Sequence, residues 1–145
     1  SMNLLYFDEW QDTDAVETMV YFLDAVMMDF ISKLEALRDA KTKEHRDAFY
    51  FIKRAYQFAV ENRALGLGVL GWHSYLQSHM IPFESMEAKK INTRVFQTIN
   101  ERAHKASREL ADLYGEPEVL RGYGVETHCG VEVTGSVITW STDRG

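Results

Sequence analysis

Apolar residues recur every three or four positions along three long stretches of the chain, the spacing of one face of an α-helix. The first stretch predicts a helix from about Asp14 to Leu37, capped by Asp14 with Glu17 three residues later. Its apolar stripe is Val16, Met19, Val20, Leu23, Met27, Phe30, Ile31 and Leu34. We expect the methionine and aromatic side chains of this helix to pack in the core. They include Met19, Phe22, Met27 and Phe30.

Two more long helices are predicted further along. The charged stretch from Lys41 to Arg46 is expected at the surface, and Thr42 or a neighbour can cap the second helix. The apolar positions of that helix are Phe49, Ile52, Ala55, Tyr56 and Ala59. The third helix begins after Ser85 and stops before Gly115 and Pro117. Its stripe is Ala88, Ile91, Val95, Ile99, Ala103, Ala106, Leu110 and Leu113.

A glycine-rich apolar run separates the second and third helices. Glycine is costly inside a helix, so Gly66, Gly68 and Gly71 predict a short buried strand over Leu65 to Leu70, where another backbone comes close. A short helix should follow over Trp72 to Ser78. On this interpretation Gly68→Val crowds the close approach and costs about 1–3 kcal/mol.

The pattern changes after residue 124. Residues Val131 to Trp140 alternate in polarity around Gly135 and Ser136, which is typical of a β-hairpin. The chain is therefore predicted to be mostly α-helical, with one buried strand and a β-leaning tail. We expect residues 1–124 to form one unit and residues 125–145 a separate tail.

Composition narrows the classes of function. The 145 residues carry a net charge of −6, which argues against a nucleic-acid or acidic-membrane surface. No apolar run is long enough to span a bilayer, and the first ten residues do not form a signal peptide. A single cysteine, Cys129, excludes an internal disulfide framework and a cysteine-based zinc cluster. These features favour a reducing, cytoplasmic setting.

The sequence offers few candidates for chemistry. Glu101 and His104 have the Glu-x-x-His spacing of di-iron helices, but only one copy occurs, beside Arg102 and Lys105, so we predict a solvated face and no metal site. His73 could act as an acid or base, but no partner is fixed by the sequence. We expect it to be a helix-start histidine bonded to backbone.

Two other candidates also have simpler explanations. Gly66, Gly68 and Gly71 match the spacing of a dinucleotide-binding loop, but they lie inside the apolar run and not after it. Cys129 has an intrinsically reactive thiol, yet only His128 is near it in the sequence, so a bystander thiol is expected. We therefore assign no catalytic, cofactor-binding or metal-binding residue to this chain.

Several collinear motifs resemble the large, catalytic subunit of class I ribonucleotide reductase. They are the Arg-Ala-Leu-Gly-Leu-Gly-Val-Leu-Gly run of residues 63–71, the Pro-Phe-Glu-Ser-x-Glu-Ala run of residues 82–88, and the helix through Asn92, Phe96 and Ile99 to Ala106–Ala111. The resemblance extends from Ser1 to Val125 and is more specific than a lone glycine pattern.

The resemblance implies a helical segment of a ten-stranded α/β barrel. The family reduces ribonucleotides to deoxyribonucleotides by thiyl-radical chemistry, with redox cysteines, a later phosphate-binding loop and a pair of radical-relay tyrosines. None of these motifs occurs here, and Ser1–Leu4 looks like the segment just beyond a redox cysteine. We expect the isolated segment to be inactive. For the parent enzyme the resemblance implies a radical from a di-metal small subunit, ATP or dNTP effectors, and thioredoxin or glutaredoxin as reductant.

The tail leaves alternatives open. Gly122–Val125 still follows the family and Thr127–His128 fits it loosely, but Cys129–Glu132 replaces the expected apolar strand. The chain could be an intein-interrupted or split-gene precursor fragment with a junction at Cys129, since inteins begin with Cys or Ser. It could also be a non-catalytic helical interaction module, which requires the apolar faces of all three long helices to be mutually buried.

Overall fold

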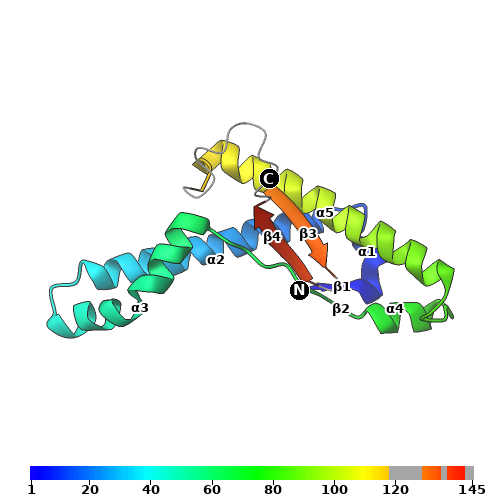
Figure 1. Ribbon diagram of the computed structural model, residues 1–145, viewed down its shortest axis with the longest axis horizontal. Helices are drawn as coiled ribbons and strands as arrows, with labels where there is room; N and C mark the ends of the chain where they lie inside the picture. The colour runs from blue at the N-terminus through cyan, green and yellow to red at the C-terminus, as the bar shows by residue number, and fades with distance from the viewer. Residues whose placement is uncertain (118–128, 135–136, 143–145) are drawn as a thin grey trace.

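The computed structural model describes residues 1–117, 129–134 and 137–142, and helices dominate it (Figure 1). The elements are β1 (Met2–Asn3), the 3-10 helix η1 (Leu4–Tyr6), α1 (Phe7–Trp10), α2 (Ala15–Arg38), α3 (Lys43–Asn62), β2 (Val69–Leu70), α4 (Trp72–Ser78), α5 (Met86–Tyr114), β3 (Cys129–Thr134) and β4 (Val137–Thr142). The mostly helical character expected from the sequence is confirmed.

The ends of α4 and α5 follow the local signals in the sequence. The Ser85 hydroxyl accepts a hydrogen bond from the Ala88 amide at 3.0 Å, so Ser85 is the predicted N-cap of α5. At the other end Gly115 has φ +85°, a conformation that suits glycine, and the helix stops at Tyr114. The bounds of α4 are those predicted.

The start of α2 differs from the expected capping box. Asp14 occupies the N-cap position, but its side chain makes no capping hydrogen bond. The Thr13 hydroxyl instead accepts a 3.3 Å hydrogen bond from the Ala15 amide. Glu17 does not turn back to Asp14, because it is buried against α5. Thr42 is likewise the N-cap residue of α3 without a capping hydrogen bond, and its hydroxyl pairs with the His45 ring at 2.8 Å.

The core lies where the first half of α2 crosses α5 and meets the N-terminal segment. The largest fully buried side chains come from η1, α1, α2, α4 and α5, so segments far apart in the sequence share one apolar cluster. They are Leu4, Phe7, Val16, Leu76, Val95 and Ile99. Burying each of these side chains contributes about 1.5–3 kcal/mol to stability.

The second half of α2 leaves this core and pairs with α3 as an antiparallel arm (Figure 1). Only Ala59 of α3 is buried. The expectation that the aromatic residues of the first helix all pack inside is wrong for Phe22 and Phe30, which are 60% and 41% exposed. The reason is that one helix, α3, covers only one side of this half of α2.

The glycine-rich run forms a much shorter strand than expected. Only Val69–Leu70 is strand, and it pairs in parallel with Met2–Asn3; the Met2 amide donates to the Gly68 carbonyl at 2.8 Å. Leu67 is buried, but Leu70 is 52% exposed. A buried strand over all of residues 65–70 is therefore not found, because within the described chain β1 is the single neighbour of β2. Its other edge has no partner there.

In the tail the backbone of β3 pairs with β4 in antiparallel register, with Val131 opposite Trp140, and β3 contacts α5. The predicted turn residues Gly135 and Ser136 lie outside the described residues. So do Gly122–Val125 and Thr127–His128. In the part of the chain that the structure describes, no helix is long and apolar enough to cross a membrane.

Candidate functional site

Among the described glycines, the one with the closest neighbours is Gly71, at the junction where β2 turns into α4. Gly71 has φ +82°, and a Cβ added there would lie 2.4 Å from Asn3 Oδ1 and 3.2 Å from the Leu5 amide nitrogen. Asn3 itself is held on both sides. Its Oδ1 accepts from the Leu5 amide at 3.1 Å, and its carbonyl accepts from Trp10 Nε1 at 2.9 Å. The close backbone approach predicted for the glycine run thus occurs at Gly71.

The other two glycines are less constrained than we expected. A Cβ on Gly68 would meet only the Ser1 hydroxyl, at 3.3 Å, and one on Gly66 would meet nothing within 4 Å. The large cost predicted for Gly68→Val is therefore reassigned to Gly71. Because Gly66 and Gly68 precede β2, the run does not have the strand–loop–helix order of a dinucleotide-binding loop.

A cluster of Asp8, Tyr75 and His79 joins α1 to α4. The Tyr75 hydroxyl donates to Asp8 Oδ2 at 3.1 Å, and His79 Nε2 lies 3.2 Å from the same oxygen. Burial and, secondly, the Asp8 hydrogen bond raise the pKa of Tyr75 above its usual value. The phenol is thus kept neutral as a hydrogen-bond donor. The cluster fastens two elements and does not prepare a tyrosinate base.

A second polar cluster lies between α2 and α5. The Glu17 carboxylate is buried, with Arg102 Nη1 at 3.4 Å and Lys105 Nζ at 3.6 Å. Next to it, the Tyr21 hydroxyl donates to Glu109, and this hydrogen bond raises the pKa of Tyr21 to about 12. Two cations around one buried carboxylate offset the cost of removing it from water.

An ion pair between Asp24 and Arg63 fastens the end of α3 to the middle of α2. Arg63 Nη2 lies 2.7 Å from Oδ1 and 2.9 Å from Oδ2 of Asp24, and both side chains are largely buried. Arg63 ends α3 with φ +45°, a conformation that costs a residue with a side chain about 1–3 kcal/mol. The ion pair holds Arg63 in that conformation.

Sequence reasoning missed these buried acids, although a signal was present. Glu17 and Asp24 are seven residues apart, two helical turns, so they interrupt the inner side of a stripe that is otherwise apolar. A charged residue on the inner face of a helix needs a partner, which sequence alone could not name.

The candidates that the sequence did single out lie apart from one another. His73 is the second residue of α4, so it lies at a helix start as expected. Its ring packs edge-on against Phe83, with ring centroids 6.5 Å apart, and makes no hydrogen bond to backbone among the described residues. On α5, Glu101 is exposed and His104 is half-buried. The described residues include no group of three or more His, Cys, Asp or Glu side chains able to hold a metal ion. The side chain of Cys129 lies outside the description.

The three polar clusters, around Asp8, Glu17 and Asp24, have a structural role. Each joins two elements, and no buried side-chain nitrogen or oxygen in the described part of the chain lacks a partner. The arrangement can fix α1, α2, α4 and α5 around the β1–β2 pair. The Ser78 hydroxyl lies 3.0 Å from His79 Nδ1, but it also donates to the Tyr75 carbonyl at 2.8 Å, one turn back along the chain. We therefore assign this contact to the C-terminal end of α4.

A protein-family model described as the ribonucleotide reductase barrel domain matches residues 2–128. The chain is 41% identical over 125 residues to the putative ribonucleoside-diphosphate reductase large subunit of Frog virus 3, covering 86% of this chain and 20% of that protein. It is 34% identical over 147 residues to the large subunit from Invertebrate iridescent virus 6, covering 98% of this chain and 14% of that one.

A solved structure is also similar. The class Id ribonucleotide reductase alpha subunit of Actinobacillus ureae matches with a TM-score of 0.71 and 52% sequence identity, over 86% of this chain and 22% of that one. The chain therefore spans between 14% and 22% of the length of these three proteins.

Proposed function

Because the chain belongs to the ribonucleotide reductase barrel-domain family, we propose that it is one segment of a ribonucleoside-diphosphate reductase large subunit. The observation that carries this proposal is the family match over residues 2–128. In the proposed whole protein, β1 and β2 are neighbouring strands of the ten-stranded α/β barrel, and the helices cover it.

The open edges of the strand pair support this role. Parallel strands occur almost only in sheets covered by helices on both faces, and β1 reaches β2 through a crossover that includes α2 and α3. Two strands of two residues each would be a marginal sheet alone. Exposed side chains such as Leu70 and Leu113 add apolar surface that further strands and helices could cover.

The chemistry is proposed for the whole subunit and not for this segment. The parent would reduce ribonucleotides to deoxyribonucleotides by thiyl-radical chemistry for DNA synthesis, in the cytoplasm. Its catalytic cysteines, phosphate-binding loop and relay tyrosines would lie in other segments. The radical would come from a separate di-metal small subunit, and thioredoxin or glutaredoxin would supply electrons under control of ATP or dNTP effectors. We propose no membrane or direct nucleic-acid partner.

The proposed role of this chain is then to hold its helices and the β1–β2 strand pair in place within the barrel. Asp8, Tyr75 and His79 hold α4 beside α1, and the Glu17 cluster holds α5 against α2. We infer that these contacts between helices determine how the β1–β2 pair is oriented relative to the other strands of the barrel. Displacing either helix would move a barrel strand, and small displacements of a scaffold can cost large factors in rate.

The interaction-module alternative is disfavoured by the incomplete burial of the predicted apolar face of α3. That hypothesis requires the apolar faces of all three long helices to be mutually buried. On the predicted apolar face of α3, Ala59 is buried and Ala55 is exposed, and the other three positions are half-buried. The protein-splicing alternative stays a prediction. If Cys129 is a splicing nucleophile, Cys129→Ala abolishes every thioester or cleavage product; mass spectrometry of purified chain would show whether any such product forms.

A chimaera tests the proposed function. Residues 2–128 of this chain would replace the matching segment of the Actinobacillus ureae alpha subunit, which is 52% identical over the aligned part. We expect the purified chimaera, with its radical partner, to reduce ribonucleoside diphosphates within about tenfold of the parent rate, since the segment supplies scaffold and not reacting groups. The isolated chain should show no reduction.

Two controls sharpen this test. A chimaera carrying Gly66→Val should keep its activity, because a Cβ there meets nothing, whereas one carrying Gly71→Val should lose it with the fold. A chimaera that folds normally but does not reduce substrate would contradict the proposal. Reduction by the isolated chain would contradict it equally.

A further inference from the structure

Both ring nitrogens of His79 face oxygen atoms, in the contact that joins α4 to α1. Nδ1 lies 2.9 Å from the Tyr75 carbonyl oxygen and 3.0 Å from the Ser78 hydroxyl oxygen. Nε2 lies 3.2 Å from Oδ2 of Asp8. The Ser78 hydroxyl donates its own hydrogen to the Tyr75 carbonyl, and the Tyr75 hydroxyl donates its hydrogen to Asp8. Each of these oxygens is therefore left to accept a hydrogen bond from the ring.

These surroundings favour the doubly protonated ring of His79. A carbonyl or a carboxylate can only accept, so a ring nitrogen bonds to it only when that nitrogen carries a hydrogen. The charged ring has a hydrogen on both nitrogens and can make both bonds, whereas the neutral ring keeps one of them and loses its attraction to Asp8. The ring also belongs to the C-cap residue of α4, where the helix dipole favours a positive charge.

The other titratable groups near His79 do not change this preference. Tyr75 stays a donor, because burial and the hydrogen bond to Asp8 raise its pKa. Arg94 of α5 acts on the pKa of Tyr75 in the opposite direction, but its effect is smaller. The remaining titratable residues of α1, η1 and the loop after α4 bring no further cation to the contact; they are Glu9, Tyr6 and Glu84.

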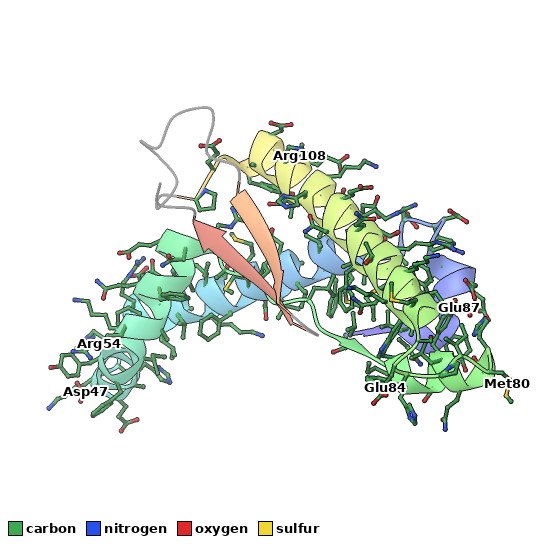
Figure 2. The ribbon with its side chains drawn as sticks, turned by 45° about the vertical axis from the view of Figure 1, so that its right-hand side comes forward. Asp47, Arg54, Met80, Glu84, Glu87 and Arg108 are labelled. Atoms are coloured by element: carbon green, nitrogen blue, oxygen red, sulfur yellow. The ribbon has the colours of Figure 1, made fainter. Side chains whose placement is uncertain are left out.

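The residue after His79 has a strained backbone. Met80 has φ +55°, a conformation common for glycine and rare for a residue with a side chain. Figure 2 shows Met80 at the far end of the molecule, beyond α4, and it is 88% exposed. The Met80 and Ile81 amides close the helix by donating to the Gln77 and Leu76 carbonyls, at 3.1 and 2.9 Å. Because strain favours opening of this helix end, α4 depends more on the His79 contact to stay closed.

We propose that His79 is a pH-dependent latch between α4 and α1. The doubly protonated ring bonds to the Tyr75 carbonyl and the Asp8 carboxylate together, and loss of one proton weakens the attachment of α4. Histidine side chains usually change charge between about pH 5 and 8. The stabilisation is therefore present at the acid end of that range and is lost as the pH rises through it. The latch is independent of the enzyme function proposed above, since it rests on these contacts alone.

Hydrogen exchange of the full chain tests the latch. Protection factors of the α4 amides would be measured by NMR at about pH 5.5 and about pH 8, each corrected for the intrinsic exchange rate at that pH. In the unmodified chain they should fall about fivefold from the lower to the higher pH. In His79→Gln they should be the same at both values, because the glutamine amide does not titrate. Asp8→Asn should also lose most of the response, since it keeps an acceptor for Tyr75 but not the charge.

The matched control is His73→Gln, the same substitution at an exposed histidine of the same helix, whose ring packs against Phe83. It should keep the fivefold response, and circular dichroism should show equal helix content in all variants. Protection of α4 that does not depend on pH in the unmodified chain would overturn the proposal. A response that survives His79→Gln, or one that His73→Gln removes, would overturn it too, because another group would then be responsible.

Discussion

Gly71→Val should destabilise the chain by about 4 kcal/mol, the largest effect we expect of a single substitution outside the buried core. Two costs add. The backbone at Gly71 has φ +82°, which a β-branched residue rarely adopts. The new Cβ would also lie 2.4 Å from Asn3 Oδ1, and Asn3 cannot withdraw without losing its hydrogen bond from Leu5. Urea unfolding followed by circular dichroism measures the loss.

Gly66→Val is the matched control for that experiment. The glycine-rich run and the new residue are the same, but a Cβ on Gly66 meets nothing within 4 Å. The expected change is below about 1 kcal/mol. Gly68→Val should fall between the two, because only the Ser1 hydroxyl must move. Equal losses at all three positions would show that a general strand preference, and not the junction with Asn3, determines the glycine pattern.

Arg63→Met should destabilise the chain by about 3 kcal/mol, because it leaves the Asp24 carboxylate buried without its partner. Methionine keeps an unbranched side chain at φ +45°, so the backbone cost is unchanged. The loss should appear as opening of the α2–α3 arm. Hydrogen exchange would detect it in the second half of α2 before the core formed with α5.

A double-mutant cycle separates pairing from packing. Asp24→Leu together with Arg63→Met should cost less than the sum of the single changes, since no unpaired charge then remains. Lys33→Met provides the surface comparison: its ion pair with Asp29, at 2.6 Å, is exposed on both sides and should contribute no more than about 0.5 kcal/mol. Additive effects at Asp24 and Arg63 would contradict a coupled ion pair.

Local signals in the sequence determine most of the helical bounds. The stripe from Ala88 to Ala106 is buried as predicted except at Ile91, which is half-buried. Ser85 and Gly115 bound α5 because their conformations depend only on neighbouring residues. Trp72–Ser78 was predictable for the same reason. Leu113 belongs to the same stripe but is 73% exposed, because the described chain offers the last turn of α5 no neighbour to bury it.

Features that join distant residues could not be derived from local patterns. Asp24 and Arg63 are 39 positions apart, and Glu17 and Arg102 are 85 apart. Nothing in the periodicity says that Glu17 faces α5 and leaves the N-cap of its own helix without a partner. The strand pairing of Met2 with Val69 is equally non-local. The family resemblance did predict the fold, because a known family fold specifies which distant segments of the chain lie together.

The most direct test of the central claim, that this chain is a segment of a reductase barrel, is a crystal structure of the chimaera with the Actinobacillus ureae alpha subunit. We predict that Met2–Asn3 and Val69–Leu70 pair in parallel as in the isolated chain, and that each gains a second barrel strand on its open edge. The helices α2 and α5 should lie outside the barrel. A structure in which residues 2–128 fold as a separate helical unit, with the barrel left open, would contradict the account.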